Sequence, residues 1–145
     1  MRSYPPAIIM EGGAVKDYKR SQDMAAKIKA REKECWANAF RALDEIPDAI
    51  YIEGWALGPD GLMFEHGWLE LDGVIIDPTL NDPTYPISYY PGIRFTRAEI
   101  REAMSKAKED LPIYWFMIKT GGHPDYKAAF DQALKDFNDR RKAEP

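Results

Sequence analysis

The chain has 145 residues, which is the usual size of one domain, so we expect a single unit over residues 1–145. Hydrophobic residues make up 45% of the sequence and charged residues 30%, which supplies a buried core and excludes a wholly disordered chain. The net charge of -4 and the pI near 5.2 argue against a protein that binds nucleic-acid phosphates.

The absence of targeting signals and the single cysteine limit where the protein is expected to act and which kinds of site it can hold. No run of about 18 apolar residues is present, so the sequence predicts no membrane span and no membrane partner. Met1 to Pro6 lack the continuous apolar run of a secretory signal, and we expect a cytoplasmic protein. Cys35 is the only cysteine, which excludes an internal disulfide and a site with several cysteine ligands. A chemical role for Cys35 would therefore be nucleophilic or redox.

Helical composition dominates the first part of the chain and returns near its end. Residues 17–43 contain no Gly or Pro and predict helix, at least from Cys35 onward, and the sequence leaves open whether one helix or two cover this span. A Thr-x-x-Glu capping box at residues 96–99 predicts a helix that runs to about Asp110. A last helix with one apolar face is expected from residue 124.

Three extended segments lie in the middle of the chain: residues 49–57, 62–71 and 74–77. Gly-Pro-Asp-Gly at residues 58–61 and Asp72-Gly73 are typical hairpin turns, so we expect an antiparallel meander. Residues 78–91 predict an irregular loop, and residues 113–118 a fourth strand. The fold class is therefore α+β: a helix bearing Cys35 packs on an antiparallel sheet of three or four strands, with two C-terminal helices.

Cys35, His66 and Asp77 occur in the order of a thiol nucleophile, its base and an orienting carboxylate. The two-residue turn after the second strand would place His66 and Asp77 on one face at diagonal positions, with Cα atoms about 7–8 Å apart. If the preceding loop is just residues 58–61, Glu53 falls directly opposite His66. His66 would then lie between two carboxylates.

Three runs downstream of Cys35 carry a resemblance to a known family: residues 51–56 (Tyr-Ile-Glu-Gly-Trp-Ala), 66–70 (His-Gly-Trp-Leu-Glu) and 74–79 (Val-Ile-Ile-Asp-Pro-Thr). They resemble the transglutaminase-like branch of the papain-like cysteine enzymes. Residues 89–93 resemble the Tyr-Gly turn of small bacterial and phage members. The resemblance implies that Cys35 is the nucleophile, His66 the general base and acid, and Asp77 the residue that orients His66.

Two positions near Cys35 depart from this pattern or leave it open. Papain-type enzymes carry an oxyanion-hole Gln six residues before the nucleophile, where this chain has Lys29, so only the backbone N–H of Cys35 or Trp36 is identified as an oxyanion donor. Asn38, one turn after Cys35, either faces the site or lies on a solvated helix face, and the solvated face is the commoner arrangement.

Four further residues are candidates for substrate-contact or supporting roles, with a structural role as the alternative for each. Glu53 lies either at the site or at an exposed edge, because a buried mid-strand carboxylate needs a partner. Trp55 and Trp68 are first of all core residues and secondly walls of a substrate groove. His123 precedes Pro124 in a Gly-rich turn and is expected to be a loop or helix-cap residue.

The sequence therefore predicts thiol-dependent amide chemistry without a cofactor: hydrolysis or acyl transfer through a thioester at Cys35. The expected partner is a peptide or other amide-containing substrate, proteins included. The pattern does not choose between protease, deamidase, amidase and transglutaminase outcomes, and the oligomeric state stays open. Two alternatives remain: a binding or inhibitor protein without turnover, and a single metal held by Cys35, His66 and Asp77 or Glu53.

Overall fold

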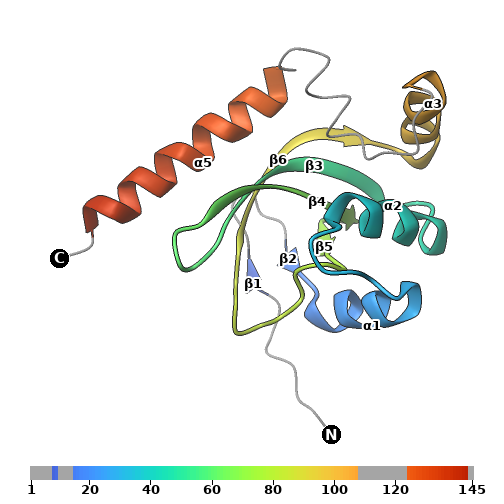
Figure 1. Cartoon of the computed structure of the whole chain (residues 1–145), viewed down its shortest axis with the longest axis horizontal. Helices are drawn as coiled ribbons and strands as arrows, with labels where there is room; N and C mark the ends of the chain where they lie inside the picture. The colour runs from blue at the N-terminus through green and yellow to red at the C-terminus, as the bar shows by residue number, and fades with distance from the viewer. Residues whose placement is uncertain (1–7, 10–14, 108–123, 144–145) are drawn as a thin grey trace, which may run out of the picture.

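The computed structural model describes residues 8–9, 15–107 and 124–143, which form an α+β fold (Figure 1). The elements are β1 (Ile8–Ile9), β2 (Val15–Lys16), α1 (Tyr18–Ile28), α2 (Cys35–Glu45), β3 (Ile50–Leu57), β4 (Met63–Leu71), β5 (Val74–Ile76), β6 (Ser88–Phe95), α3 (Arg97–Ala107) and α5 (Pro124–Ala143). The strands form one sheet in the order β1-β2-β5-β4-β3-β6. Strands β2 and β5 are parallel, and the other neighbours are antiparallel.

The α+β class and the β3-β4-β5 meander are confirmed, but the expectation of three or four strands is wrong, since the sheet has six strands in the described residues alone. Strands β1 and β2 have two residues each, too few to show alternation in the sequence. Strand β6 begins inside the predicted loop 78–91 and contains Pro91. It lies at the edge of the sheet, and Pro91 sits where its pairing with β3 shifts register, which is where a strand tolerates proline.

The predicted strand register is correct for the second hairpin of the meander and wrong for the first. Leu71 pairs with Val74, as the two-residue Asp-Gly turn predicts. In the first hairpin Leu57 pairs with Met63 rather than Leu62, so the predicted register is wrong by one residue. The cause is local: Asp60 accepts a hydrogen bond from the Leu62 N–H, which holds Leu62 in the turn with 58% of its surface exposed.

Two helices cover the span predicted as one or two. Helix α1 ends at Ile28 and is capped by Lys29, which has φ 53°. Lys33 has φ 62°, so two lysines occupy left-handed positions usually taken by glycine. The sequence carries no signal for this break because neither residue is a typical helix terminator. As a result, Cys35 is the first residue of α2.

The C-terminal helices agree with their predictions as far as the structure describes them. Thr96 and Glu99 make the reciprocal hydrogen bonds of a capping box ahead of α3. The predicted end of that helix at Asp110, the predicted strand 113–118 and His123 lie outside the described residues. None of the helices in the described ranges is long and apolar enough to cross a membrane.

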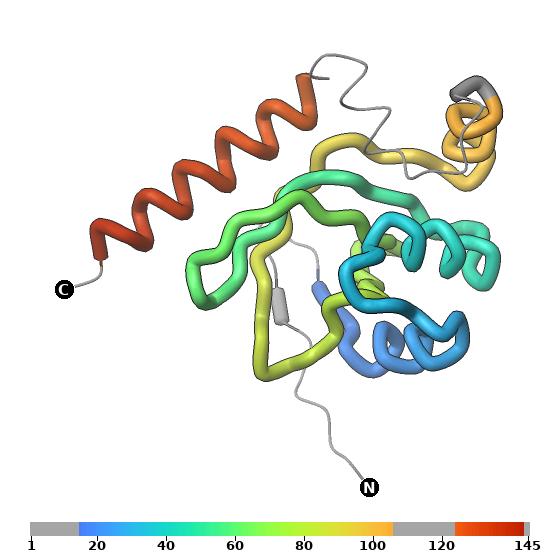
Figure 2. The backbone as a smooth tube through the Cα atoms, in the orientation of Figure 1, coloured from blue at the N-terminus to red at the C-terminus, as the bar shows by residue number. Residues whose placement is uncertain are grey.

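The helices pack on one face of the sheet, and Figure 2 traces their backbone beside the strands. A second cluster of buried residues lies on the other face. Helix α2 packs against Tyr51, Leu69 and Ile76, and α1 lies beside it. Helix α5 covers the hairpin end of β3 on the same face, at Leu57 and Tyr90. The opposite face buries a cluster of residues from the central strands and β6: Ile52, Ala56, Trp68, Ile75, Ile87 and Tyr89.

Candidate active site

A buried histidine–aspartate pair lies where β5 ends. His66 Nε2 and Asp77 Oδ2 are 2.7 Å apart, with 2% of His66 and 0% of Asp77 exposed. The register explains the contact: since Leu71 pairs with Val74, Asp77 falls diagonally to His66 on the same face. The structure therefore brings these two predicted site residues together.

Cys35 meets this pair from the start of α2. Its side chain is 7% exposed and lies close enough to His66 to help raise the pKa of the imidazole. Because His66 Nε2 is bonded to Asp77, Nδ1 is the ring nitrogen left for the sulfur. The structure thus places thiol, imidazole and carboxylate in the sequence that proton transfer from sulfur requires.

The approach of α2 to β4 depends on a glycine and on the short length of β5. A Cβ at Gly67 would lie 2.8 Å from Trp36 Cδ1, so only glycine lets the helix begin this close. Gly67 and His66 point to opposite faces of β4, and α2 lies on the Gly67 face. Strand β5 ends opposite Leu69, and no described strand adjoins that edge of β4 near His66.

The charges of the pair stabilise each other. Burial lowers the pKa of His66, but the charge and hydrogen bond of Asp77, with the neighbouring Cys35, outweigh it and raise this pKa to about 9. Burial raises the pKa of Asp77, but His66 and Lys16 outweigh it and lower this pKa to about 2. The arrangement favours an imidazolium–carboxylate pair at neutral pH, beside the thiol.

Asp77 also organises the turn that follows it. Its Oδ1 accepts hydrogen bonds from the backbone N–H groups of Thr79 and Leu80, both at 3.0 Å. Its own N–H donates to Ser21 Oγ on α1. Asp77 thus caps this turn with one oxygen and contacts His66 with the other.

Asn38 is fully buried, so the expected solvated helix face is wrong. Its amide donates to the Arg31 carbonyl and to Thr79 Oγ1, and its Oδ1 accepts from the Arg31 N–H and from Arg41. The amide oxygen and nitrogen are therefore both bonded, to the loop before α2, to α2 itself and to Thr79, which is 41 residues away. Helical periodicity does not reveal these contacts. Asn38 ties the loop before Cys35 to the turn after Asp77.

Asn38→Ala is expected to lower the free energy of unfolding by about 2 kcal/mol, because it removes a fully buried amide and its part-buried hydrogen bonds to Arg31 and Thr79. Urea unfolding followed by circular dichroism measures this change, and Asn138→Ala on the exposed face of α5 is the matched control. Equal stabilities of the two variants would show that Asn38 does not hold these segments together.

Glu53 does not flank His66, contrary to the predicted register. It pairs with Gly67, so its side chain points to the face that α2 covers, while His66 lies opposite Gly54. Glu53 is fully buried, and its Oε1 accepts a 2.7 Å hydrogen bond from the Tyr51 hydroxyl. The one-residue difference in the hairpin loop accounts for the error, since such a slip moves every side chain to the other face.

The two tryptophans occupy different environments. Trp68 is fully buried and stacks on the His66 ring, with centroids 5.9 Å apart and planes 21° apart. Trp55 packs on Phe130 and Tyr126 of α5. Both are packing residues, and Trp68 in addition supports the imidazole.

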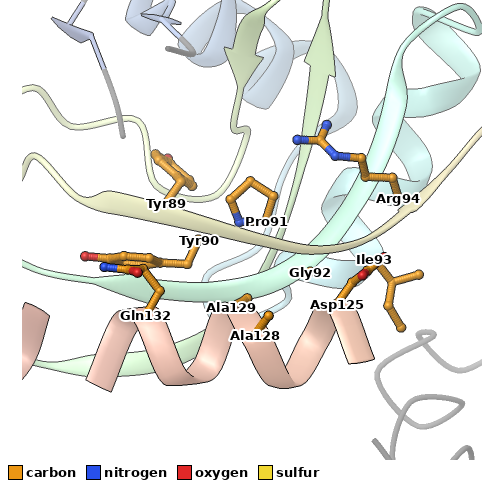
Figure 3. A pocket seen from close by; sticks show the side chains of 10 residues that line it. All are labelled: Tyr89, Tyr90, Pro91, Gly92, Ile93, Arg94, Asp125, Ala128, Ala129 and Gln132. Carbon is orange, nitrogen blue, oxygen red and sulfur yellow. The ribbon is translucent and has the colours of Figure 1, made fainter. Parts of the chain in front are cut away.

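An open groove of about 590 Å³ runs between β6 and α5 (Figure 3). Its lining comes from the edge strand and the facing side of the helix: Tyr89, Tyr90, Pro91, Gly92, Ile93, Arg94, Asp125, Ala128, Ala129 and Gln132. Neither Trp55 nor Trp68 lines it, and neither does Cys35, His66 or Asp77. Tyr89 is the one lining residue that also contacts the site, through its hydrogen bond to Asp77.

Sequence reasoning missed two residues that contact Asp77 or its turn. Tyr89 donates to Asp77 Oδ2, and Lys16 donates to the Leu80 carbonyl. Tyr89 was assigned to a loop, and Lys16 lies on a two-residue strand, so neither pattern indicated a place near the site. One chemical feature of the sequence could have indicated Lys16. A lysine that follows the apolar Val15 on a strand at the sheet is rarely buried without a partner.

The alternative of a single metal finds no ligand set in the described ranges, where no three His, Cys, Asp or Glu side chains are grouped to hold an ion. His66 Nε2 is instead directed at Asp77. Comparison with known proteins adds no assignment: no family model, no curated protein and no solved structure matches this chain.

Proposed function

We propose that this protein is a thiol-dependent amide hydrolase or acyltransferase in which Cys35, His66 and Asp77 act together. The observation that carries the proposal is the buried 2.7 Å contact between His66 and Asp77, with Cys35 near enough to help raise the pKa of the same imidazole. Such a set is what transglutaminase-like cysteine enzymes use, and the sequence resemblance supports the same assignment. The single thiol suits a reducing compartment such as the cytoplasm.

The proposed reaction proceeds from the form of the site in which His66 is neutral, with its Nε2 proton directed at Asp77 and Nδ1 free. In this form the Cys35 thiol transfers its proton to His66 Nδ1, and the sulfur attacks the carbonyl carbon of an amide. The tetrahedral intermediate collapses when the C–N bond breaks and the imidazolium gives its proton to the departing amine. The thioester that remains passes its acyl group to water, an amine or a thiol, and His66 takes the proton of that acceptor. Asp77 stays ionised and holds the imidazole in place.

The start of α2 supports the negative charge of the intermediate. Backbone N–H groups in the first helical turn lack intrahelical partners, and in the described part of the chain Glu34 makes no side-chain cap at this position. The N–H groups of Cys35 and Trp36, together with the positive end of the helix dipole, therefore serve as oxyanion donors in this proposal. Lys29 lies exposed at the end of α1, so it supplies no counterpart to the oxyanion Gln.

A second candidate function is a binding protein that retains this arrangement without turnover. The low exposure of the site favours it, since only 7% of Cys35 and 2% of His66 contact solvent. The two candidates differ in one observable: an enzyme accumulates or turns over an acyl group on Cys35, whereas a binding protein leaves this thiol unmodified.

Acylation of Cys35 by p-nitrophenyl acetate tests the proposed function. Intact-mass spectrometry is expected to find one acetyl group, which hydroxylamine removes, because a thioester is labile to this nucleophile. Cys35 is the only cysteine, so Cys35→Ala controls for reaction elsewhere. His66→Ala is expected to slow acylation about 100- to 10,000-fold. Equal acylation rates of the wild type and His66→Ala would reject the proposed triad.

A further inference from the structure

A buried lysine lies close to the candidate site and is not used by the proposed reaction. Lys16 has no exposed surface, and its Nζ lies 4.7 Å from the centroid of the Tyr18 ring and 5.1 Å from that of Tyr89. It donates a hydrogen bond to the Leu80 carbonyl. A fully buried ammonium group is rare because it loses its hydration, so its place here calls for a specific role.

Tyr89 reaches the same part of the site from β6. Its hydroxyl donates a 2.7 Å hydrogen bond to Asp77 Oδ2, the oxygen that also faces His66 Nε2. The ring packs between Trp68 and the Lys16 ammonium group. Tyr89 therefore fixes the position of the carboxylate oxygen that orients the imidazole.

Lys16 acts on the other oxygen through the backbone. The Leu80 carbonyl accepts from Lys16, and the Leu80 N–H donates to Asp77 Oδ1. The ammonium group also attracts the Asp77 carboxylate through space. One carboxylate is thus held at Oδ2 by Tyr89 and at Oδ1 by a backbone segment that Lys16 fixes.

We propose that Tyr89 and Lys16 are positioning residues of this site, which hold Asp77 so that its Oδ2 orients His66 toward Cys35. The expected effect on the reactivity of Cys35 rests on the proposed function. The geometry of the His66–Asp77 pair can be tested without it.

A purely structural role fits Lys16 poorly. A methionine of similar length would fill the same space without a desolvated charge, and buried charges often contribute little to stability. Burial lowers the pKa of Lys16 to about 8, although Asp77 partly opposes this. The fold thus disfavours the very charge that faces Asp77, which is expected of a residue kept for the site and not for stability.

The test uses Tyr89→Phe and Lys16→Met in the full chain. Each variant has a matched control: one on β6 for Tyr89 and one on α1, three residues further along the chain, for Lys16. Tyr90→Phe removes the neighbouring hydroxyl of β6, which bonds Asp136 on α5, and Lys19→Met removes an exposed ammonium group on α1. Two readouts are compared: the rate of iodoacetamide alkylation of Cys35 and the NMR signal of the His66 Nε2 proton. His123→Gln identifies the His66 signal, since the chain has 2 histidines.

Tyr89→Phe and Lys16→Met are each expected to slow alkylation about five- to fifty-fold and to shift or broaden the His66 proton signal. The two controls should stay within twofold of the wild type, and Lys16→Met should keep or raise the melting temperature. Wild-type alkylation with an unchanged His66 signal in Lys16→Met would overturn the proposal for Lys16, and the same result in Tyr89→Phe would overturn it for Tyr89.

Failure of the proposed function would look different. In that case His66→Ala would alkylate like the wild type, while the His66 signal would still report whether Tyr89 and Lys16 position the pair. If Tyr89→Phe does not fold, as circular dichroism would show, Lys16→Met decides whether Asp77 is held in this way, because its effect passes through the same carboxylate.

Discussion

Asp77→Asn is expected to lower the rate of Cys35 acylation by about ten- to ten-thousand-fold while the protein stays folded. The asparagine amide can donate a hydrogen bond to the imidazole, so it permits the ring orientation or tautomer that keeps the proton on the wrong nitrogen. It also removes the negative charge that supports the imidazolium formed when Cys35 loses its proton. Stopped-flow acylation with p-nitrophenyl acetate measures the rate, and circular dichroism checks the fold.

Glu53→Gln is the matched control, because Glu53 is a second fully buried carboxylate. It lies on β3, which is next to β4, the strand that carries His66. Glu53 accepts a hydrogen bond from Tyr51 and pairs with Gly67, so its side chain lies on the face that α2 covers and not on the face of His66. Its substitution should therefore change the rate of acylation only a few-fold. Its main effect is expected on stability through the Tyr51 hydrogen bond. Full activity in Asp77→Asn with none in a folded Glu53→Gln would transfer the orienting role to Glu53.

The contrast between these carboxylates also shows which part of the site is predictable from sequence. A two-residue Asp-Gly turn has one favoured geometry, so the register between β4 and β5, and with it the contact of His66 with Asp77, follows from the sequence. The sequence of the longer Gly-Pro-Asp-Gly-Leu loop is compatible with several turn geometries. Asp60 selects one in which Leu62 joins the turn, which shifts Glu53 away from His66.

The supporting residues were not predictable for another reason: their partners are distant in the chain. Asn38 bonds Thr79, 41 residues away, and Lys16 bonds Leu80, 64 residues away. Local periodicity describes which residues face a core but not which polar groups meet there. Tyr89 depends on β6, an edge strand whose proline made the segment look like a loop. These contacts arise only once the six strands are assembled.

The ion pair should give the protein a pH-dependent stability with a definite sign. The pKa of His66 is raised to about 9 in the folded protein, against 6.5 for a free histidine, so folding favours the protonated ring. The resulting stability is fully present below pH 6.5 and is lost as the pH rises through 9. A shift of this size corresponds to about 3 kcal/mol of stability. The lowered pKa of Asp77 reports the same ion pair, so it adds no separate contribution.

The measurement is the difference in unfolding free energy between the wild type and His66→Gln, taken by urea unfolding from pH 6 to pH 9.5. This difference should fall by about 3 kcal/mol across that range. Lys16 has the opposite trend, because its pKa is lowered by burial from 10.5 to about 8 and stability rises with pH between these values. Since Lys16 is present in both proteins, its contribution largely cancels in the difference. A difference that stays constant from pH 6 to 9.5 would mean that His66 gains no proton affinity on folding, and the imidazolium–carboxylate pair would not be the resting form of the site.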